Sequence, residues 1–236
     1  MEHALILGAT KGIGFALAAQ LLAQGMRVTI SGREQSGIDA ALARLASPHA
    51  AGLVVDMRDF GAARTALQTF EHIDHMVLCG SSDVAWGPFA TLDMAALERA
   101  LHMKLTGYLN AVQSALPKLA ERGSVTFIGG AASRAAMPGT AGLAAVNGGL
   151  MAVTRTLAKE LAPRRVNLVS PGLTDTDAYA GMPADAKAKL FQGAAEKLPV
   201  GRTGFAQDIA GAISFAIGNS YVTGTLIDVD GGAHLG

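Results

Sequence analysis

The stretch Gly8-Ala9-Thr10-Lys11-Gly12-Ile13-Gly14 decides the fold of this chain. It follows a short apolar run, residues 4–7, and opens a stretch of helical period, residues 13–24, so it forms a strand-to-helix turn. Glycines at this spacing have three uses. They adopt the unusual backbone angles of the turn, they let a phosphate approach the helix N-terminus, and they allow the helix to pack closely on the strand. A tight turn without a ligand is the alternative that the glycine pattern alone leaves open.

Short apolar runs alternate with longer stretches of helical period along the chain. The predicted strands are residues 4–7, 27–31, 53–55, 75–79, 124–128, 166–169 and 226–229, and the predicted helices are residues 13–24, 37–46, 60–70, 95–119, 139–161 and 205–217. Strands without polar alternation belong to a sheet that is covered on both faces. The pattern therefore predicts an α/β fold, a doubly wound parallel sheet with helices on both faces, whose ligands bind beyond the carboxyl ends of the strands.

Residues 174–198 form an Ala/Lys-rich stretch between the sixth predicted strand and the last predicted helix. No linker or repeat divides the chain, so we expect one domain over residues 1–236. Residues 174–198 are then an insertion within it, and their length and composition predict a mobile helical lid.

Composition excludes several classes of function. The 236 residues carry 19 basic and 19 acidic side chains with no net charge, and only 5% are aromatic, which argues against nucleic-acid binding. No apolar window is long enough to span a membrane. The single cysteine, Cys79, cannot form an intrachain disulfide, and the histidines show no metal-ligand grouping. We expect a cytoplasmic protein that acts on a small molecule and holds no metal.

Further motifs make the glycine stretch specific. They are Asp56-Met57, residues 165–172 with Thr176 beyond them, and residues 221–232. Together with the Gly-x-x-x-Gly-x-Gly spacing, they resemble the short-chain dehydrogenase/reductase family over nearly the whole chain. The resemblance implies a single Rossmann-type domain that binds a nicotinamide dinucleotide and assembles as a homodimer or homotetramer.

The resemblance also implies which residues hold the dinucleotide. They lie in the glycine stretch and at the ends of the later strands: Gly8, Thr10, Lys11, Gly12, Ile13, Gly14, Ser31, Arg33, Asp56, Met57, Cys79, Gly80, Ser81, Pro171, Gly172, Thr174 and Thr176.

The end of the second predicted strand bears on cofactor choice. An acidic residue there selects NAD by bonding the ribose 2′-hydroxyl, but this chain has Ser31-Gly32-Arg33. Arg33 suits a 2′-phosphate, and Lys11 lies where NADP-preferring relatives carry a basic residue. Each cation alone is equally explained as an ordinary solvated side chain. Together, and without a strand-end acid, they favour NADP(H) over NAD(H).

The family's catalytic pattern is interrupted at all four of its positions. That pattern is a Tyr-x-x-x-Lys pair on a helix, a serine thirteen residues before the tyrosine, and an asparagine on the preceding long helix. Alignment on residues 157–163 places Leu143, Asn147, Gly130 and Lys104 at the tyrosine, lysine, serine and asparagine positions. Leucine cannot donate a proton, so carbonyl chemistry loses its usual general acid, typically worth ~10²–10⁴-fold in rate.

The amine and the amide of this pattern have changed places. We hypothesise that Lys104 restores a cation near the ribose and the substrate oxygen, or acts as the acid when desolvated, and that Asn147 bonds the ribose. Coincidence with drift is the alternative.

Three further residues are weaker candidates for the site. Ser133 and Arg134 follow the fifth strand and either line a pocket for a carboxylate or phosphate or form a solvated turn. Tyr179 is the one tyrosine placed to swing over a nicotinamide, although a lid residue that packs on apolar substrate or on the core is the better explanation.

Three functions follow from these observations. The first is an NADP(H)-dependent oxidoreductase acting on a small carbonyl, hydroxyl, imine or activated alkene through a non-standard active site. The second is a catalytically silent NADP(H)-binding sensor or regulatory subunit, and the third is a structural subunit. The retained cofactor motifs argue against the third, and the length of residues 174–198 favours the first.

Overall fold

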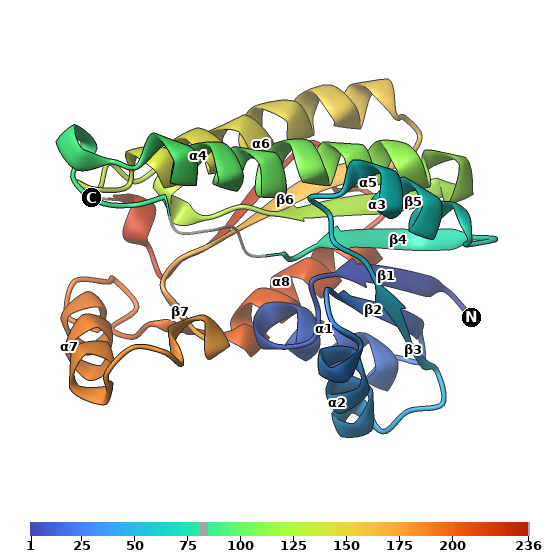
Figure 1. The fold of residues 1–236 in the computed structure, drawn as a ribbon, viewed down its shortest axis with the longest axis horizontal. Coiled ribbons are helices and arrows are strands. Elements are labelled where there is room, and N and C mark those ends of the chain that lie inside the picture. Colours follow the sequence, from blue (N-terminus) through green and yellow to red (C-terminus); the bar gives the residue numbers. More distant parts are fainter. Residues whose placement is uncertain (81–84, 236) are drawn as a thin grey trace.

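Seven strands form one parallel sheet in the computed structural model, which describes residues 1–80 and 85–235 (Figure 1). All neighbouring strands pair in parallel. In sheet order they are β3 (Ala50–Val54), β2 (Arg27–Gly32), β1 (His3–Leu7), β4 (Ile73–Leu78), β5 (Leu119–Ile128), β6 (Arg165–Pro171) and β9 (Leu226–Val229). The predicted doubly wound sheet is confirmed. Its order reverses at β1, which opens the crevice at the carboxyl ends of β1 and β4 where such sheets bind ligands.

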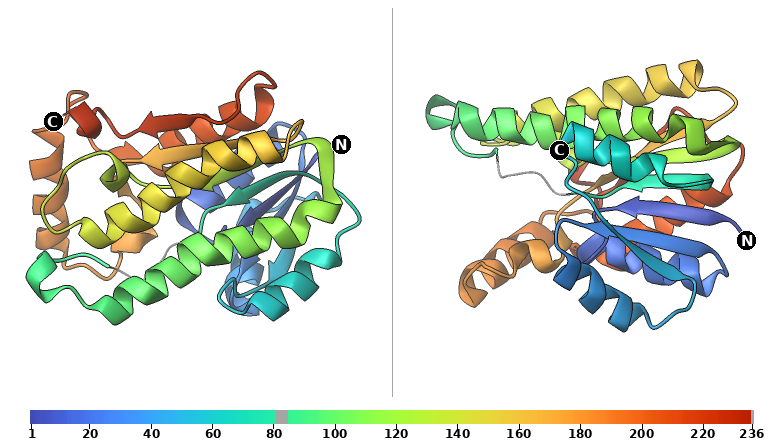
Figure 2. Two further views of the ribbon diagram at one scale, coloured as in Figure 1. Left: turned by 90° about the horizontal axis from the view of Figure 1, so that it is seen from above. Right: turned by 45° about the vertical axis from the view of Figure 1, so that its right-hand side comes forward.

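Helices cover both faces of the sheet (Figures 1 and 2). On one face lie α3 (Phe60–Gln68), α4 (Met94–Ala100), α5 (Gly107–Ala115) and α6 (Ala141–Glu160), and on the other α1 (Gly12–Ala23), α2 (Gln35–Leu45) and α8 (Ala206–Gly218). Each face has its own apolar core, with Leu67 and Leu150 buried in one and Leu17 and Ile213 in the other. Among the described residues, no helix combines the length and the apolar character that crossing a membrane requires.

The predicted helix over residues 95–119 is interrupted. A π-helical turn, Leu101–Thr106, separates α4 from α5. The Thr106 hydroxyl donates to the carbonyl oxygen of His102 at 3.0 Å and so satisfies a carbonyl in the widened turn. Single π-turns inside helices occur frequently at functional sites, and this one carries Lys104.

Two predicted strands begin later than the observed ones. β5 starts at Leu119 rather than Ser124, because Leu119 pairs with Ile73 ahead of an irregularity in the register. β3 starts at Ala50 rather than Leu53. It lies at the edge of the sheet, where small, partly exposed residues pair with β2 without forming an apolar run.

Residues 174–198 contain β7 (Thr174–Asp175), a 3₁₀ turn (Asp177–Tyr179) and α7 (Ala184–Ala195). β7 pairs with the two-residue strand β8 (Gly204–Phe205), which ties this segment to the start of α8. No residue of α7 is buried, and the helix stands away from the sheet (Figure 1). A cavity of about 620 Å³ lies between this segment, α1 and the start of α8.

Candidate active site

The glycine stretch forms a rigid loop for the reasons that its spacing predicts. Gly8 and Gly12 have φ angles of +83° and +58°, which disfavour any residue with a side chain. A Cβ on Gly14 would lie 2.5 Å from the Gly8 carbonyl oxygen, so close packing of α1 on β1 requires glycine there. Ser31 braces the loop from β2, because its hydroxyl accepts from the Gly8 amide at 3.1 Å.

The N-terminus of α1 receives its anion from a distant part of the chain. Lys11 at the N-cap makes no side-chain cap, and the first turn has no acidic residue. Instead, the Gly12 amide donates to Oδ2 of Asp177 at 3.2 Å. Unpaired amides and the helix dipole make this position suited to a phosphate, and a carboxylate already binds there. Sequence reasoning missed Asp177, although it directly follows the predicted cofactor residue Thr176.

The ends of β3 and β4 border the same crevice. Arg58 binds the Asp56 carboxylate with its Nη2 at 2.6 Å, and this hydrogen bond lowers the pKa of Asp56. Arg33 is exposed, and its charge also lowers the pKa of Asp56. Burial raises the pKa of the Cys79 thiol, at the end of β4, to about 12. The predicted contact Ser81 lies outside the described residues.

The loop after β6 packs against the C-terminal turn of the chain. A Cβ on Gly172 would lie 2.7 Å from the Asp230 Cα, so the C-terminal turn packs directly against this glycine. The Thr174 hydroxyl is buried and donates to the Gly172 carbonyl oxygen at 2.9 Å. Thr176 is different, because its side chain lies in van der Waals range of the position that a Gly12 Cβ would occupy. Of the two threonines, Thr176 is therefore the one beside the glycine loop.

Lys104 and Asn147 come together although 43 residues separate them. Nζ of Lys104 donates to Oδ1 of Asn147 at 2.9 Å and to the Gly129 carbonyl oxygen at 2.9 Å. Asn147 is buried on α6, and Gly129 directly follows β5 at its carboxyl end. Burial of the ammonium lowers the pKa of Lys104 to about 8.

Gly130 completes this group. Its φ of 174° is extended backbone open to any residue, so its conformation does not require glycine. The space around Gly130 does require glycine. The three atoms nearest to an added Cβ all belong to Asn147, with Nδ2 at 2.9 Å. Leu143 lies one helical turn before Asn147 on α6 and is partly exposed.

None of the three weaker candidates forms a hydrogen bond with Lys104 among the described residues. The Ser133 hydroxyl donates to the Gly130 carbonyl oxygen at 3.0 Å within a turn. Arg134 binds the Asp228 carboxylate. Tyr179 packs edge-on against the Phe191 ring, with 5.2 Å between ring centroids, inside the predicted lid. Each has a protein partner that sequence reasoning did not foresee.

Tyr108 is a fully buried tyrosine on α5 near the crevice. Its hydroxyl donates to the Gly80 carbonyl oxygen at 2.6 Å, and burial raises its pKa well above the ordinary value. It therefore supports the end of β4 and is a poor proton donor.

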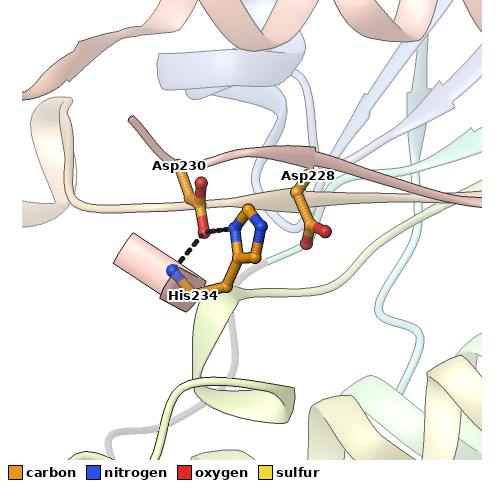
Figure 3. A group of neighbouring side chains, drawn as sticks. All are labelled: Asp228, Asp230 and His234. Atoms are coloured by element: carbon orange, nitrogen blue, oxygen red, sulfur yellow. Dashed lines mark hydrogen bonds and ion pairs between the residues drawn. The ribbon is translucent and has the colours of Figure 1, made fainter. Parts of the chain in front are cut away.

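The C-terminal turn brings Asp228, Asp230 and His234 together (Figure 3). His234 donates to Oδ2 of Asp230 from its backbone amide at 3.0 Å, and its ring Nδ1 lies 2.8 Å from the same oxygen. The other Asp230 oxygen accepts from the Gly232 amide at 2.9 Å. The Arg134 guanidinium binds Oδ2 of Asp228, whereas Oδ1 of Asp228 is buried without a hydrogen-bond partner in the part of the chain that the structure describes. Because both oxygens of Asp230 accept hydrogen bonds from within the turn, we assign Asp230 and His234 to holding the turn that packs against Gly172.

Comparison with known proteins identifies the family. A family model described as enoyl-(acyl carrier protein) reductase matches residues 8–234. An uncharacterised oxidoreductase of Methylorubrum extorquens is 32% identical over 97% of this chain and 96% of its own. The chain belongs to the short-chain dehydrogenase/reductase family.

Further members of this family show the same extent of match. The 3-oxoacyl-(acyl-carrier-protein) reductase FabG of Escherichia coli is 28% identical over 98% of this chain and 97% of its own. A crystal structure of a small-chain dehydrogenase in complex with NADPH is 37% identical with a TM-score of 0.88, covering 100% of this chain and 99% of that one. The similarity therefore extends through both the cofactor loops and the helices that carry Lys104 and Asn147.

Proposed function

We propose that this short-chain dehydrogenase/reductase is an NADP(H)-dependent oxidoreductase with a rearranged active site. Its substrate is a small carbonyl, hydroxyl, imine or activated alkene. The observation that carries the proposal is the contact between Lys104 and Asn147. Drift would leave two unrelated substitutions, whereas these two form one hydrogen-bonded pair at the carboxyl end of the sheet.

Several residues support binding of the dinucleotide. Gly8, Gly12 and Gly14 leave the space and the backbone angles for a pyrophosphate at the α1 N-terminus. Arg33 and Lys11 are both exposed cations suited to a 2′-phosphate, and the similar solved structure holds NADPH. Bound there, the dinucleotide supplies or accepts a hydride at its nicotinamide. Asp177 then leaves the Gly12 amide, because two anions cannot share it.

Lys104 supplies the positive charge of the pocket. Two of its three ammonium protons bond to Gly129 and Asn147, which leaves one donor for a ligand. Leu143 supplies no proton where the family places its tyrosine, and neither Tyr108 nor Tyr179 replaces it. This loss favours the alternative function, an NADP(H)-binding sensor or a regulatory or structural subunit without turnover.

The assembly and the lid complete the proposal. We expect a homodimer or homotetramer, to be determined by light scattering, and a lid over residues 174–198 that covers the substrate. Limited proteolysis tests the lid, because NADPH and substrate should protect α7 from cleavage.

The decisive experiment titrates the protein with NADPH and, separately, with NADH. Trp86, the only tryptophan, is 57% exposed, and it follows the end of β4, so energy transfer to the nicotinamide reports binding. Tight binding of NADPH with weak binding of NADH is expected. Turnover of a carbonyl, imine or enone by the loaded protein then separates the enzyme from the silent sensor. If the protein binds neither NADPH nor NADH, both the enzyme and the silent sensor are contradicted.

Lys104→Ala tests the rearranged site itself. We expect weaker NADPH binding and loss of turnover. A Lys104→Ala protein with full NADPH affinity and any turnover would show that the amine has no part in the function.

A further inference from the structure

We propose that the side-chain amide of Asn147 binds the carbonyl oxygen of the substrate, with Lys104 and Gly130 as its positioning residues. This inference rests on the proposed function and narrows its substrate class to α,β-unsaturated carbonyl compounds. The sequence alone assigned Asn147 to the ribose. The position of its amide nitrogen against Gly130 favours the substrate instead.

The orientation of the amide follows from its partner. A lysine ammonium has three donors and no acceptor, so the Asn147 atom that faces Nζ at 2.9 Å is the oxygen. The nitrogen is then the atom that faces Gly130. Lys104 thus holds the amide in one of its two orientations, and Gly129 holds Lys104.

The amide nitrogen is left available. In the described part of the chain, Nδ2 of Asn147 takes part in no hydrogen bond, whereas its Oδ1 accepts from Nζ of Lys104. Gly130 leaves room for it, because a side chain at this position would begin 2.9 Å from Nδ2. The backbone conformation of Gly130 suits any residue, so the fold does not require glycine there. The missing side chain instead leaves space beside the Asn147 amide. The two protons on Nδ2 therefore remain available to an acceptor at the carboxyl end of β5.

This arrangement suits an oxygen that becomes negative. A cation bonded to the amide oxygen polarises the amide and strengthens the hydrogen bonds that its N–H groups donate. Donors already in place where charge develops stabilise it without reorganisation. An amide nevertheless keeps its protons, so Asn147 stabilises an oxyanion and does not protonate it.

The substrate class follows from that limit. In an α,β-unsaturated carbonyl compound, the β-carbon receives the hydride from the reduced nicotinamide, and the C=C electron pair shifts to form an enolate. Asn147 holds the enolate oxygen, and a proton from water then bonds to the α-carbon, so the oxygen needs no acid. A saturated ketone becomes an alkoxide, a much stronger base than an enolate, so its formation depends more on the general acid that Leu143 does not provide.

The first test uses the absorbance of 4-(dimethylamino)cinnamaldehyde, an unsaturated aldehyde whose maximum moves to longer wavelength when its oxygen is bound by a strong donor. The protein is loaded with NADP⁺, so the probe is not consumed. We expect a red shift with the wild type, its loss in Asn147→Leu and its retention in Asn110→Leu. Asn110 is the matched control, because its amide faces the Phe60 carbonyl oxygen at 3.4 Å, outside the pocket.

Gly130→Ala provides a second variant should Asn147→Leu not fold. It keeps every polar group but places a methyl 2.9 Å from Nδ2, so the amide moves and the shift decreases. An unchanged shift in Asn147→Leu or Gly130→Ala, or no shift in the loaded wild type, overturns the inference. Failure to bind NADP⁺ or NADPH, measured separately through Trp86, overturns the proposed function instead.

The second test compares NADPH oxidation with 2-cyclohexenone and with cyclohexanone. A missing general acid costs a saturated ketone ~10²–10⁴-fold, so we expect the enone to react at least about 100-fold faster. Equal rates, or a preference for cyclohexanone, would contradict the assigned substrate class and leave NADPH binding unaffected.

Discussion

The glycine loop and the Lys104–Asn147 pair lie at the same edge of the sheet, but the loop is built from backbone and the pair from side chains. The loop consists of backbone: two left-handed glycines and a third that carries no Cβ because a carbonyl oxygen lies 2.5 Å away. The Lys104–Asn147 pair consists of side chains, which a hydrogen bond joins. A backbone site accepts almost no substitution. A side-chain site can tolerate a substitution when a second change compensates for it.

The strongest test of this contrast is Gly14→Val. The new side chain would begin 2.5 Å from the Gly8 oxygen and 2.8 Å from the Ala9 Cα, both backbone atoms that cannot turn away. We expect at least about 100-fold weaker NADPH binding and ~1–3 kcal/mol lower stability. Titration and thermal denaturation measure both. Gly211→Ala on α8, where an added Cβ meets nothing within 4 Å, should retain binding and gain up to ~1 kcal/mol.

Lys104→Met should have the next largest effect. It keeps the length of the side chain but removes the charge that polarises Asn147, so turnover of 2-cyclohexenone should fall by ~10²–10³-fold. The exchanged double variant, Lys104→Asn with Asn147→Lys, retains an amine and an amide and should recover part of that loss. Lys159→Met, in the last turn of α6, is the control. Additive losses in the double variant would contradict a coupled pair.

Arg33→Ala should separate the two nicotinamide cofactors. Hydrogen bonds to a charged group contribute ~1.5–3 kcal/mol, so NADPH affinity should fall by about 10- to 100-fold while NADH affinity stays the same. Arg122→Ala, at the amino end of β5, should change neither value. If Arg33→Ala lowers the affinity for NADPH and for NADH equally, Arg33 does not bind the 2′-phosphate.

The pH dependence tests the charge on Lys104. Its pKa of about 8 leaves Nζ mostly protonated below that pH, so kcat/KM should be nearly constant near pH 6–7 and fall about tenfold between pH 7 and 9. Cys79 is the titratable group that interacts with Lys104. Its own pKa is about 12, so the thiol stays neutral between pH 6 and 9 and does not contribute to the profile. A pH profile measures this, and Lys104→Met should lack the descending limb.

Stability should depend on pH in the opposite direction. The folded pKa of Lys104 is lowered from 10.5 to about 8, so the unfolded chain binds more protons between these values. The contribution of Lys104 to the free energy of unfolding therefore rises with pH across this window. Comparing denaturant midpoints of wild type and Lys104→Met at pH 7 and 9.5 measures it. A difference that stays constant would show that the amine titrates normally.

The smallest expected effect is that of Asp177→Asn. The carboxylate competes with a phosphate for the Gly12 amide, and charge at a helix N-terminus contributes ~0.3–1 kcal/mol. NADPH affinity should therefore rise about two- to fivefold in titration. Asp185→Asn, in the first turn of α7, should leave it unchanged. Weaker NADPH binding in Asp177→Asn would mean that the carboxylate supports the bound cofactor.

The sequence predicted the backbone half of the molecule well and the side-chain half only in part. Apolar runs and glycine spacing indicate the strands, the helices and the shape of the loop directly, because these depend on local geometry. The exchange of Lys104 and Asn147 was visible as a pattern, but the hydrogen bond between them depends on packing of α6 against the π-turn. Asp177 and the Arg134–Asp228 pair involve partners far apart in the chain, for which no local signal exists.

The raised pKa of Cys79 also makes the protein convenient to label. With a pKa of about 12, the only thiol of the chain is almost entirely protonated at neutral pH, and maleimides react with the thiolate. A cysteine introduced on exposed α7 would therefore carry a fluorophore while the natural one stays unmodified. Motion of residues 174–198 during nucleotide binding can then be followed by distance-dependent fluorescence against Trp86, in the otherwise natural chain.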